Sequence, residues 1–278
     1  MERPDLNAAT CRSGASGRKL RAVRAVIFDI YGTLLQVGPP PADAVAGWER
    51  LFREMLGVPP PLSREAFAAR ANEVIAREHA AARARGIAWP EVLWPQIVLE
   101  VVPSLRRLSP VALEEFVCRQ MALERTLRLQ PGAAECLRRL RERGVRLGLA
   151  SNSQAYTQRE LETHFRAAGL DPGWFEPALC YRSFEHGFSK PDPHVFQLLS
   201  ARLAARGIAP EQTLMVGDRL DNDIEPARAF GWQTWWFLPA PGAAPPVENA
   251  GDFDALRAEL GLDSSSPAAD GRGRQPTL

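Results

Sequence analysis

A carboxylate, a small hydroxyl residue, a lysine and an acidic cluster occur in that order along this chain. Asp29 ends the run AVIF, Ser151 ends LGLA, Lys190 lies in GFSKPDP and Asp218 opens DRLDND. Such apolar runs are typical of buried strands, and parallel strands bring their carboxyl ends to one edge of a sheet, where ligands bind. The order of these segments therefore predicts one polar pocket with the side chains needed for catalysis.

The formal charges of this pocket do not balance. Asp29, Asp218 and Asp223 would place three negative charges against the single cation of Lys190, and like charges at close range are costly. A hard divalent cation held by carboxylate and backbone oxygens is the usual solution, and Mg2+ also takes a substrate phosphate. We therefore expect a Mg2+ site formed by these three aspartates together with backbone oxygens.

Five apolar runs provide the strands that would carry these residues. They are VRAVIFD (23–29), VRLGLAS (145–151), ALCY (178–181), TLMVGD (213–218) and QTWWFL (233–238). The last four are separated by segments of helical length, and this alternation predicts βαβ units with a parallel sheet covered on both faces. The predicted fold class is α/β, with a core formed by residues 20–35 and 131–262.

A long segment with a helical pattern separates the first two strands. From residue 36 to residue 130 apolar residues recur at three- and four-residue spacing, and Ser63 and Ser109 mark helix starts. The segment predicts an all-helical insertion of roughly 90 residues, large enough for a core of its own. Because it follows the strand that ends in Asp29, we expect it to lie over the site as a lid.

In these four motifs the sequence resembles the haloacid dehalogenase (HAD) superfamily of hydrolases and phosphatases. The motifs are DIYGT at 29–33, SN at 151–152, KP at 190–191 and GDRLDND at 217–223. The likeness extends over about residues 23–35 and 130–240. The insertion, residues 36–130, is similar to the type-one cap of that superfamily in its position and its helicity.

The resemblance implies a Rossmannoid core with an inserted cap domain and assigns a role to each motif. Asp29 is the implied nucleophile, and Ser151 and Lys190 are the implied anion holders. Asp218 and Asp223 belong to the implied acidic loop that positions Mg2+, and Tyr31 would offer the metal only its backbone carbonyl. Asp221 is a competing choice for the second acidic ligand, and the sequence leaves that choice open.

Tyr31 departs from the phosphatase pattern. Phosphatases of the superfamily carry a second aspartate there as the catalytic acid and base, and such proton transfer contributes about 10²- to 10⁴-fold. A phenol whose pKa is near 10 is a poor substitute. The dehalogenases of the superfamily open with the same DxYGT pattern, because a halide leaves without a proton. Tyr31, at this catalytic position, therefore points toward dehalogenation.

The acidic loop points the other way. The dehalogenases use no metal and usually have a neutral Ser-Asn pair where this chain has Gly217 and Asp218. The sequence thus favours Mg2+-dependent phosphoryl hydrolysis of a small phosphorylated metabolite, with good leaving groups such as acyl or aryl phosphates. One alternative is a 2-haloacid dehalogenase-type hydrolase. Another is a catalytically weak protein that binds a phosphate ligand.

Three further polar residues are candidate substrate contacts. Thr33 and Asn152 stand inside the first two motifs, and His186 lies four residues before Lys190. A lone loop histidine more often faces solvent. Asn152 or Ser151 is equally suited to cap the helix that follows.

Composition limits the partners. The net charge of the 278 residues is +1, and the basic residues are scattered, so neither nucleic acid nor a membrane surface is an expected partner. No apolar run approaches the roughly 20 residues of a membrane span. We expect a cytoplasmic protein that acts on a small anionic substrate. Residues 1–19 and 263–278 are polar and predicted to be disordered, and the oligomeric state stays open.

Overall fold

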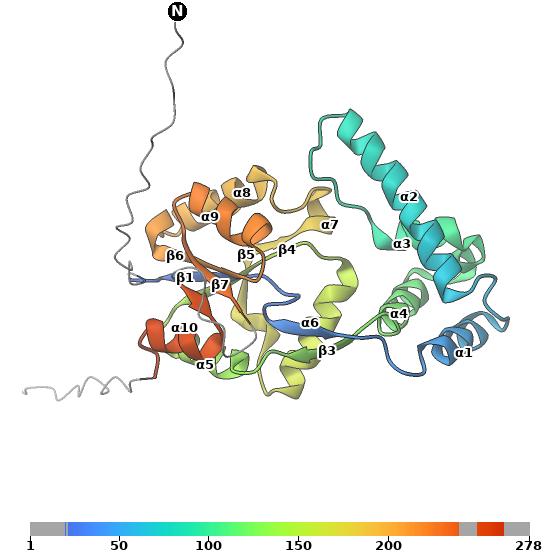
Figure 1. The fold of residues 1–278 in the computed structure, drawn as a ribbon, viewed down its shortest axis with the longest axis horizontal. Helices are drawn as coiled ribbons and strands as arrows, with labels where there is room; N and C mark the ends of the chain where they lie inside the picture. The colour runs from blue at the N-terminus through green and yellow to red at the C-terminus, as the bar shows by residue number, and fades with distance from the viewer. Residues whose placement is uncertain (1–19, 21, 239–248, 264–278) are drawn as a thin grey trace, which may run out of the picture.

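A six-stranded parallel sheet forms the centre of the protein in the computed structural model, which describes residues 20, 22–238 and 249–263 (Figure 1). Its strand order is β5-β4-β1-β6-β7-β8. The strands are β1 (Ala25–Phe28), β4 (Arg146–Ser151), β5 (Phe175–Arg182), β6 (Thr213–Gly217), β7 (Gln233–Phe237) and β8 (Ala250–Gly251). The five predicted strands and the α/β class are confirmed. β8 has two residues, too few to show a period in the sequence.

Each strand presents alternate side chains to two apolar layers. Val26 and Phe28 of β1 pack into one layer, and Ala25 and Ile27 pack into the other, as the two-residue period of a strand requires. The first layer is covered by α5 (Ala133–Glu142), α6 (Ala155–Ala167) and α10 (Phe253–Glu259), and the second by α8 (Pro193–Ala204) and α9 (Glu225–Ala229). With both faces covered, only the strand ends can present polar residues.

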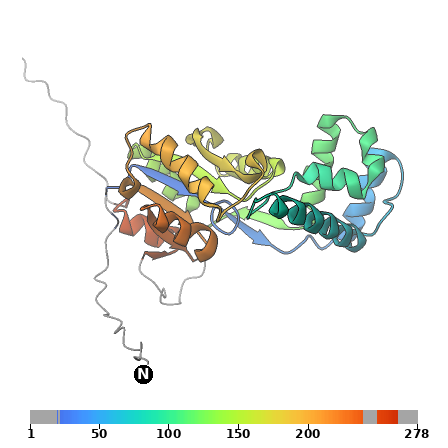
Figure 2. The same ribbon diagram turned by 90° about the horizontal axis from the view of Figure 1, so that it is seen from above.

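The insertion between β1 and β4 has a core of its own. Its helices are α1 (Ala44–Leu56), α2 (Arg64–Ala84), α3 (Trp94–Val101), η1 (Pro103–Arg107) and α4 (Pro110–Met121). Trp48, Phe67 and Phe116 are buried together in this core. Ser63 and Ser109 cap α2 and α4, as predicted, because their side chains accept the backbone N–H of Ala66 and Ala112. These helices lie to one side of the sheet (Figure 2).

The prediction that residues 36–130 are helical throughout is wrong at both ends. β2 (Leu35–Gly38) and β3 (Thr126–Leu129) form an antiparallel pair that leads into and out of the helices. Side chains of β3 alternate between exposed and half-buried positions, a two-residue period that four residues display too briefly to stand out beside a long helical pattern.

The insertion also pairs with the loop that carries the predicted lysine. The backbone N–H of Glu91 donates to the carbonyl of Gly187 (3.0 Å), and that of Ser189 donates to the carbonyl of Trp89 (2.8 Å). Ser189 immediately precedes Lys190. The insertion therefore supports the backbone from which this lysine reaches the sheet.

The remaining short elements are η2 (Pro172–Trp174), α7 (Ser183–His186), η3 (Pro210–Gln212) and η4 (Leu220–Ile224). Within the described residues, no helix combines the length and apolar character needed to cross a membrane. The termini predicted to be disordered lie outside those residues, except for Asp263.

Candidate active site

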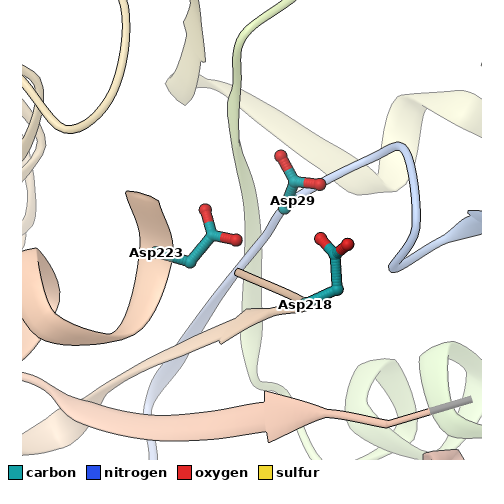
Figure 3. Close-up of side chains that lie close together, drawn as sticks. All are labelled: Asp29, Asp218 and Asp223. Atoms are coloured by element: carbon teal, nitrogen blue, oxygen red, sulfur yellow. The ribbon is translucent and has the colours of Figure 1, made fainter. Parts of the chain in front are cut away.

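Three aspartates meet at the carboxyl edge of the sheet, as their positions after β1 and β6 predicted. Asp29 follows β1, Asp218 follows β6 and Asp223 lies in η4. Each offers a carboxylate oxygen within 4.8 Å of the others, and Figure 3 shows the three side chains turned toward one another. Asp29 is still held in register by the sheet, since its N–H donates to the carbonyl of Val216 (2.9 Å).

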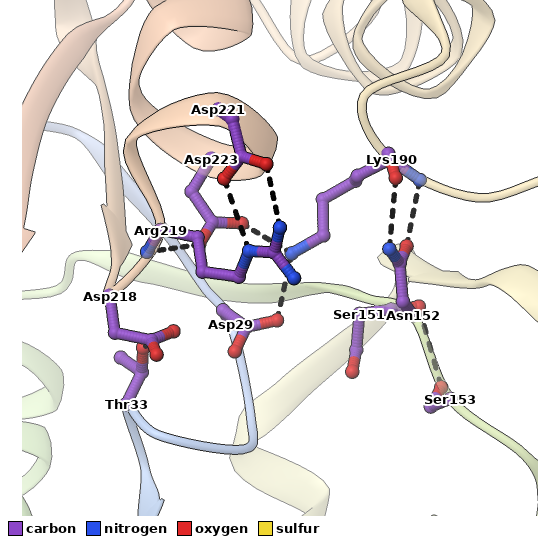
Figure 4. Close-up of polar contacts among 10 residues, drawn as sticks. All are labelled: Asp29, Thr33, Ser151, Asn152, Ser153, Lys190, Asp218, Arg219, Asp221 and Asp223. Atoms are coloured by element: carbon purple, nitrogen blue, oxygen red, sulfur yellow. Dashed lines mark hydrogen bonds and ion pairs between the residues drawn. The ribbon is translucent and has the colours of Figure 1, made fainter. Parts of the chain in front are cut away.

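Lys190 joins this cluster from the far side. Its Nζ donates to Oδ1 of Asp29 at 2.7 Å and to Oδ1 of Asp223, as Figure 4 shows. The lysine side chain is 2% exposed and that of Asp223 is 1% exposed, so neither charge is solvated. A buried charge is tolerated only where it is paired and hydrogen-bonded, and one ammonium here serves two carboxylates.

Two glycines make the close approach of the carboxylates possible. A Cβ on Gly32, where φ is +86°, would stand 2.3 Å from Oδ2 of Asp218, and one on Gly217 would stand 2.4 Å from Cγ of Asp223. Side chains at either position would push an aspartate away from the cluster. Glycine is therefore required at Gly32 for space and for its left-handed backbone.

Burial and mutual repulsion change the pKa values of the cluster. Burial raises the pKa of Asp29 to about 7; Lys190 opposes this rise, and the charges of Asp223 and Asp218 add to it. Burial and Asp223 also raise the pKa of Asp218. Although burial acts to lower the pKa of Lys190, Asp223 and Asp29 raise it above its ordinary value. The cluster therefore has more negative charge than its lysine balances.

This donor set fits a hard divalent cation. Carboxylate oxygens are the ligands that Mg2+ prefers, and three of them converge where positive charge is lacking. Asp29, Asp218 and Asp223 would hold the ion. Once bound, Mg2+ would neutralise phosphate charge and polarise a phosphoryl oxygen. Of the two candidates for the second acidic ligand of the loop, Asp223 would be the one that contacts the ion, because the carboxylate of Asp221 pairs with Arg219 instead.

Ser151, at the end of β4, has a hydroxyl without a partner. Its Oγ is buried and forms no hydrogen bond within the described residues, and Figure 4 shows it at the edge of the sheet beside Asn152. Buried hydroxyls are almost always hydrogen-bonded. An unpartnered one at this place is available to donate to a bound anion.

Two of the three predicted substrate contacts are engaged with the protein instead. The amide of Asn152 donates to the carbonyl of Lys190 (2.9 Å) and accepts the N–H of Lys190 (2.7 Å), so Asn152 positions the lysine, although it also lines the cavity. The hydroxyl of Thr33 is buried and donates to Oδ1 of Asp218 at 3.4 Å. Both contacts join distant segments of the chain, and the sequence alone does not reveal them.

His186 does not line the cavity. Its ring stacks on Tyr181, with centroids 4.5 Å apart and an interplanar angle of 8°, and the cavity beside the aspartates is lined by other residues. His186 ends α7, and that helical turn directs its ring onto Tyr181. The structure therefore gives no support to a substrate contact by His186.

Tyr31 lines the cavity with its hydroxyl fully engaged. The hydroxyl bonds to Oγ1 of Thr157 at 2.9 Å and to the carboxylate of Glu160, and it accepts a hydrogen bond from Arg125 at 2.8 Å. The Arg125 guanidinium also lies 4.5 Å from the ring centroid. Burial and the charge of Glu160 raise the pKa of Tyr31 far above its ordinary value, so this phenol neither donates nor accepts catalytic protons readily.

Sequence reasoning missed two residues that line the cavity, Arg219 and Asn222. The cavity has a volume of about 260 Å³, and its walls include Asp29, Lys190 and Asp218. Both residues lie between Asp218 and Asp223 in the acidic loop, and that position was the available signal.

A family model for haloacid dehalogenase-like hydrolases matches residues 23–231, well over half of the chain. The chain belongs to this family. It is therefore a HAD-like hydrolase, an enzyme, with the Rossmannoid sheet and helical insertion described above.

Relatives and structural neighbours of this HAD hydrolase carry different names. A glyceraldehyde 3-phosphate phosphatase from Pyrococcus abyssi is 37% identical over 40% of the chain and 43% of its own length. Another from Methanopyrus kandleri is 29% identical over 76% of the chain and 82% of its length. A 2-haloacid dehalogenase from Pseudomonas syringae pv. Tomato DC3000 shares the fold, with a TM-score of 0.57, 19% identity and coverage of 86% and 98%.

The first of these matches covers less than half of either chain. The HAD hydrolase spans less than half the length of the Pyrococcus relative that it matches. Likeness to the dehalogenase lies in the fold, at an identity of 19%. The comparisons establish the hydrolase family, and both relatives described above are named phosphatases.

Proposed function

We propose that this HAD hydrolase catalyses Mg2+-dependent phosphoryl hydrolysis of a small phosphorylated metabolite. The convergence of Asp29, Asp218 and Asp223 carries the proposal, because this donor set fits a divalent cation, which a metal-free dehalogenase does not use. An anionic haloacid would face the Asp218 carboxylate without a compensating charge. The phosphatase names of the two relatives support the same reaction.

In the proposed reaction Asp29 is the nucleophile. A carboxylate oxygen of Asp29 forms a bond to phosphorus in line with the leaving group, whose oxygen departs with the electron pair of the breaking bond. Lys190 favours the ionised form of Asp29 and stabilises charge on the phosphoryl oxygens, and the free hydroxyl of Ser151 donates to one of them. Water then attacks phosphorus, releases phosphate and restores Asp29.

The engaged hydroxyl of Tyr31 limits the substrates. No acid stands at the usual position to protonate an alkoxide, because the phenol is committed to Glu160 and Arg125. Leaving groups that depart as stable anions do not need that proton, so acyl and aryl phosphates are the favoured substrates. The second step, which needs a base, is expected to be slow.

Dehalogenation is the second candidate, and Tyr31 is the observation that favours it. Assays of phosphate release from aryl and acyl phosphates, run beside halide release from short 2-haloacids, separate the two reactions. We expect phosphate release that requires Mg2+ and is lost in EDTA. Halide release without added metal would establish the dehalogenase instead. Metal-dependent binding of phosphate without either product would leave a binding protein.

A further inference from the structure

Arg219 is a cavity-lining cation that the reaction proposed above does not use. Of the described residues that line the 260 Å³ cavity, only Lys190 and Arg219 carry positive charge. Lys190 is occupied by Asp29 and Asp223. Figure 4 shows the Arg219 side chain reaching from the loop after β6 toward the same region as the Lys190 amine.

The only partner of the Arg219 guanidinium, within the described residues, is an exposed carboxylate. Nε and Nη2 donate to the two oxygens of Asp221 at 3.1 and 2.6 Å, which leaves Nη1 without a bond. The two side chains are 58% and 63% exposed. Ion pairs this exposed contribute little stability, so the guanidinium can exchange one carboxylate for another at small cost.

The backbone and the side chain of Arg219 have separate tasks. The backbone N–H donates to Oδ2 of Asp223 at 3.1 Å and helps to fix that aspartate in the cluster. Replacement of the side chain leaves this backbone contact in place. Changes to the guanidinium can therefore be studied without removal of a bond that holds the aspartates.

We propose that Arg219 is a specificity-determining residue that binds a carboxylate on the substrate, so that the enzyme prefers small phosphomonoesters bearing a carboxylate close to the phosphate. The inference rests on the proposed phosphatase reaction. Its geometric basis is the planar guanidinium fork, which matches a carboxylate in two hydrogen bonds and already holds that of Asp221. A cavity of about 260 Å³ that Arg219 and Lys190 both line favours a small substrate whose two anionic groups lie close together.

Two substrates of similar size test this preference. Phosphoglycolate carries a carboxylate where 2-hydroxyethyl phosphate carries a neutral hydroxyl. We expect the wild-type enzyme to show a kcat/KM ratio of about tenfold in favour of the carboxylate, carried by KM, as for loss of one charge-assisted pair. Arg219→Gln should bring the ratio close to one, and Arg219→Lys should keep part of it, since it retains the charge and loses the fork.

Arg50→Gln is the matched control. Arg50 also forms an exposed ion pair, with Asp43, and the side chains are 55% and 61% exposed, but it lies on α1, away from the cavity. This variant should keep the wild-type ratio. The preference of the wild type should also fall as salt rises, because exposed charges are screened, whereas the ratio in Arg219→Gln should not respond.

A binding measurement distinguishes a failure of this inference from a failure of the proposed hydrolysis on which it rests. If neither ester releases phosphate and aryl phosphates are not hydrolysed either, phosphoryl hydrolysis fails. Calorimetry still tests Arg219 in that case, with 3-phosphonopropionate and 3-hydroxypropylphosphonate in Mg2+ buffer. Tighter binding of the carboxylate ligand, lost in Arg219→Gln, would support the assignment. An equal loss for both ligands would place Arg219 at the phosphoryl group and overturn it. A wild-type enzyme without preference would overturn it as well.

Discussion

Asp29 and Tyr31 stand two residues apart in the chain but belong to two clusters whose charges are balanced differently. The acidic cluster comprises Asp29, Asp218, Asp223 and Lys190, and the Tyr31 cluster comprises Tyr31, Arg125 and Glu160. At Asp29, three carboxylates share one ammonium, and the pKa of Asp29 is raised to about 7. At Tyr31, a phenol, a guanidinium and a carboxylate hold one another by direct hydrogen bonds. The first group has more negative charge than its lysine balances, whereas the charges of Arg125 and Glu160 in the second balance each other.

This difference separates the chemical part of the site from its support. An incomplete cluster binds, because a cation or substrate supplies what the protein lacks. A charge-balanced one fixes geometry: Arg125 precedes β3, and Glu160 lies on α6, so the Tyr31 cluster joins the return strand of the insertion to the core. Four predictions test whether the two clusters differ in this way.

The largest effect is expected for Asp29→Asn. The amide is no nucleophile, and the loss of a nucleophile typically lowers kcat by more than about 10³-fold. Initial rates of 4-nitrophenyl phosphate hydrolysis, at saturating Mg2+, measure the change. Retention of full turnover by this variant would remove Asp29 from the mechanism.

A large loss is also expected for Gly32→Ala. The new Cβ would meet Oδ2 of Asp218 at 2.3 Å, so one carboxylate leaves the cluster, and the Mg2+ concentration for half-maximal activity should rise at least about tenfold. Gly57→Ala is the matched control, since Gly57 has a φ of +73° and open space around its Cα. An equal rise in both variants would mean that backbone strain, not the carboxylate, is responsible.

A moderate effect is expected at Tyr31. Tyr31→Asp restores a carboxylic acid at this position and should raise turnover of alkyl phosphates by about tenfold, below the full contribution of a positioned acid. Tyr31→Phe should bring no such gain. It should lower the free energy of unfolding by about 1 to 3 kcal/mol through the lost hydrogen bonds, which chemical denaturation measures. A gain in Tyr31→Phe would contradict the structural role of the hydroxyl.

The smallest effect concerns pH and Mg2+. A carboxyl with a raised pKa binds its proton more tightly in the folded state, so without metal the free energy of unfolding should fall as pH rises from about 4 to about 7. Mg2+ should raise Tm by a few degrees, more at pH 8 than at pH 5, because it binds the ionised form. Melting curves with Mg2+ or EDTA test this. Asp29→Asn should flatten the metal-free slope.

Sequence predicted the site where local pattern determines position. Asp29 and Asp218 follow buried strands, and parallel pairing alone brings the ends of β1 and β6 together. Side-chain pairs between distant segments could not be predicted from local pattern, because Glu160 stands 129 residues from Tyr31 and Arg125 stands 94 residues away. The amide of Asn152, which holds the backbone of Lys190, was hidden for the same reason.

Rapid-quench kinetics with 4-nitrophenyl phosphate tests the central claim most directly. With Mg2+, we predict a burst of nitrophenol close to one equivalent per active site, followed by slow turnover limited by hydrolysis of the aspartyl phosphate. EDTA and Asp29→Asn should each abolish the burst. Release of nitrophenol that is independent of Mg2+, or a burst that persists in Asp29→Asn, would contradict an aspartate nucleophile in a metal-dependent phosphatase.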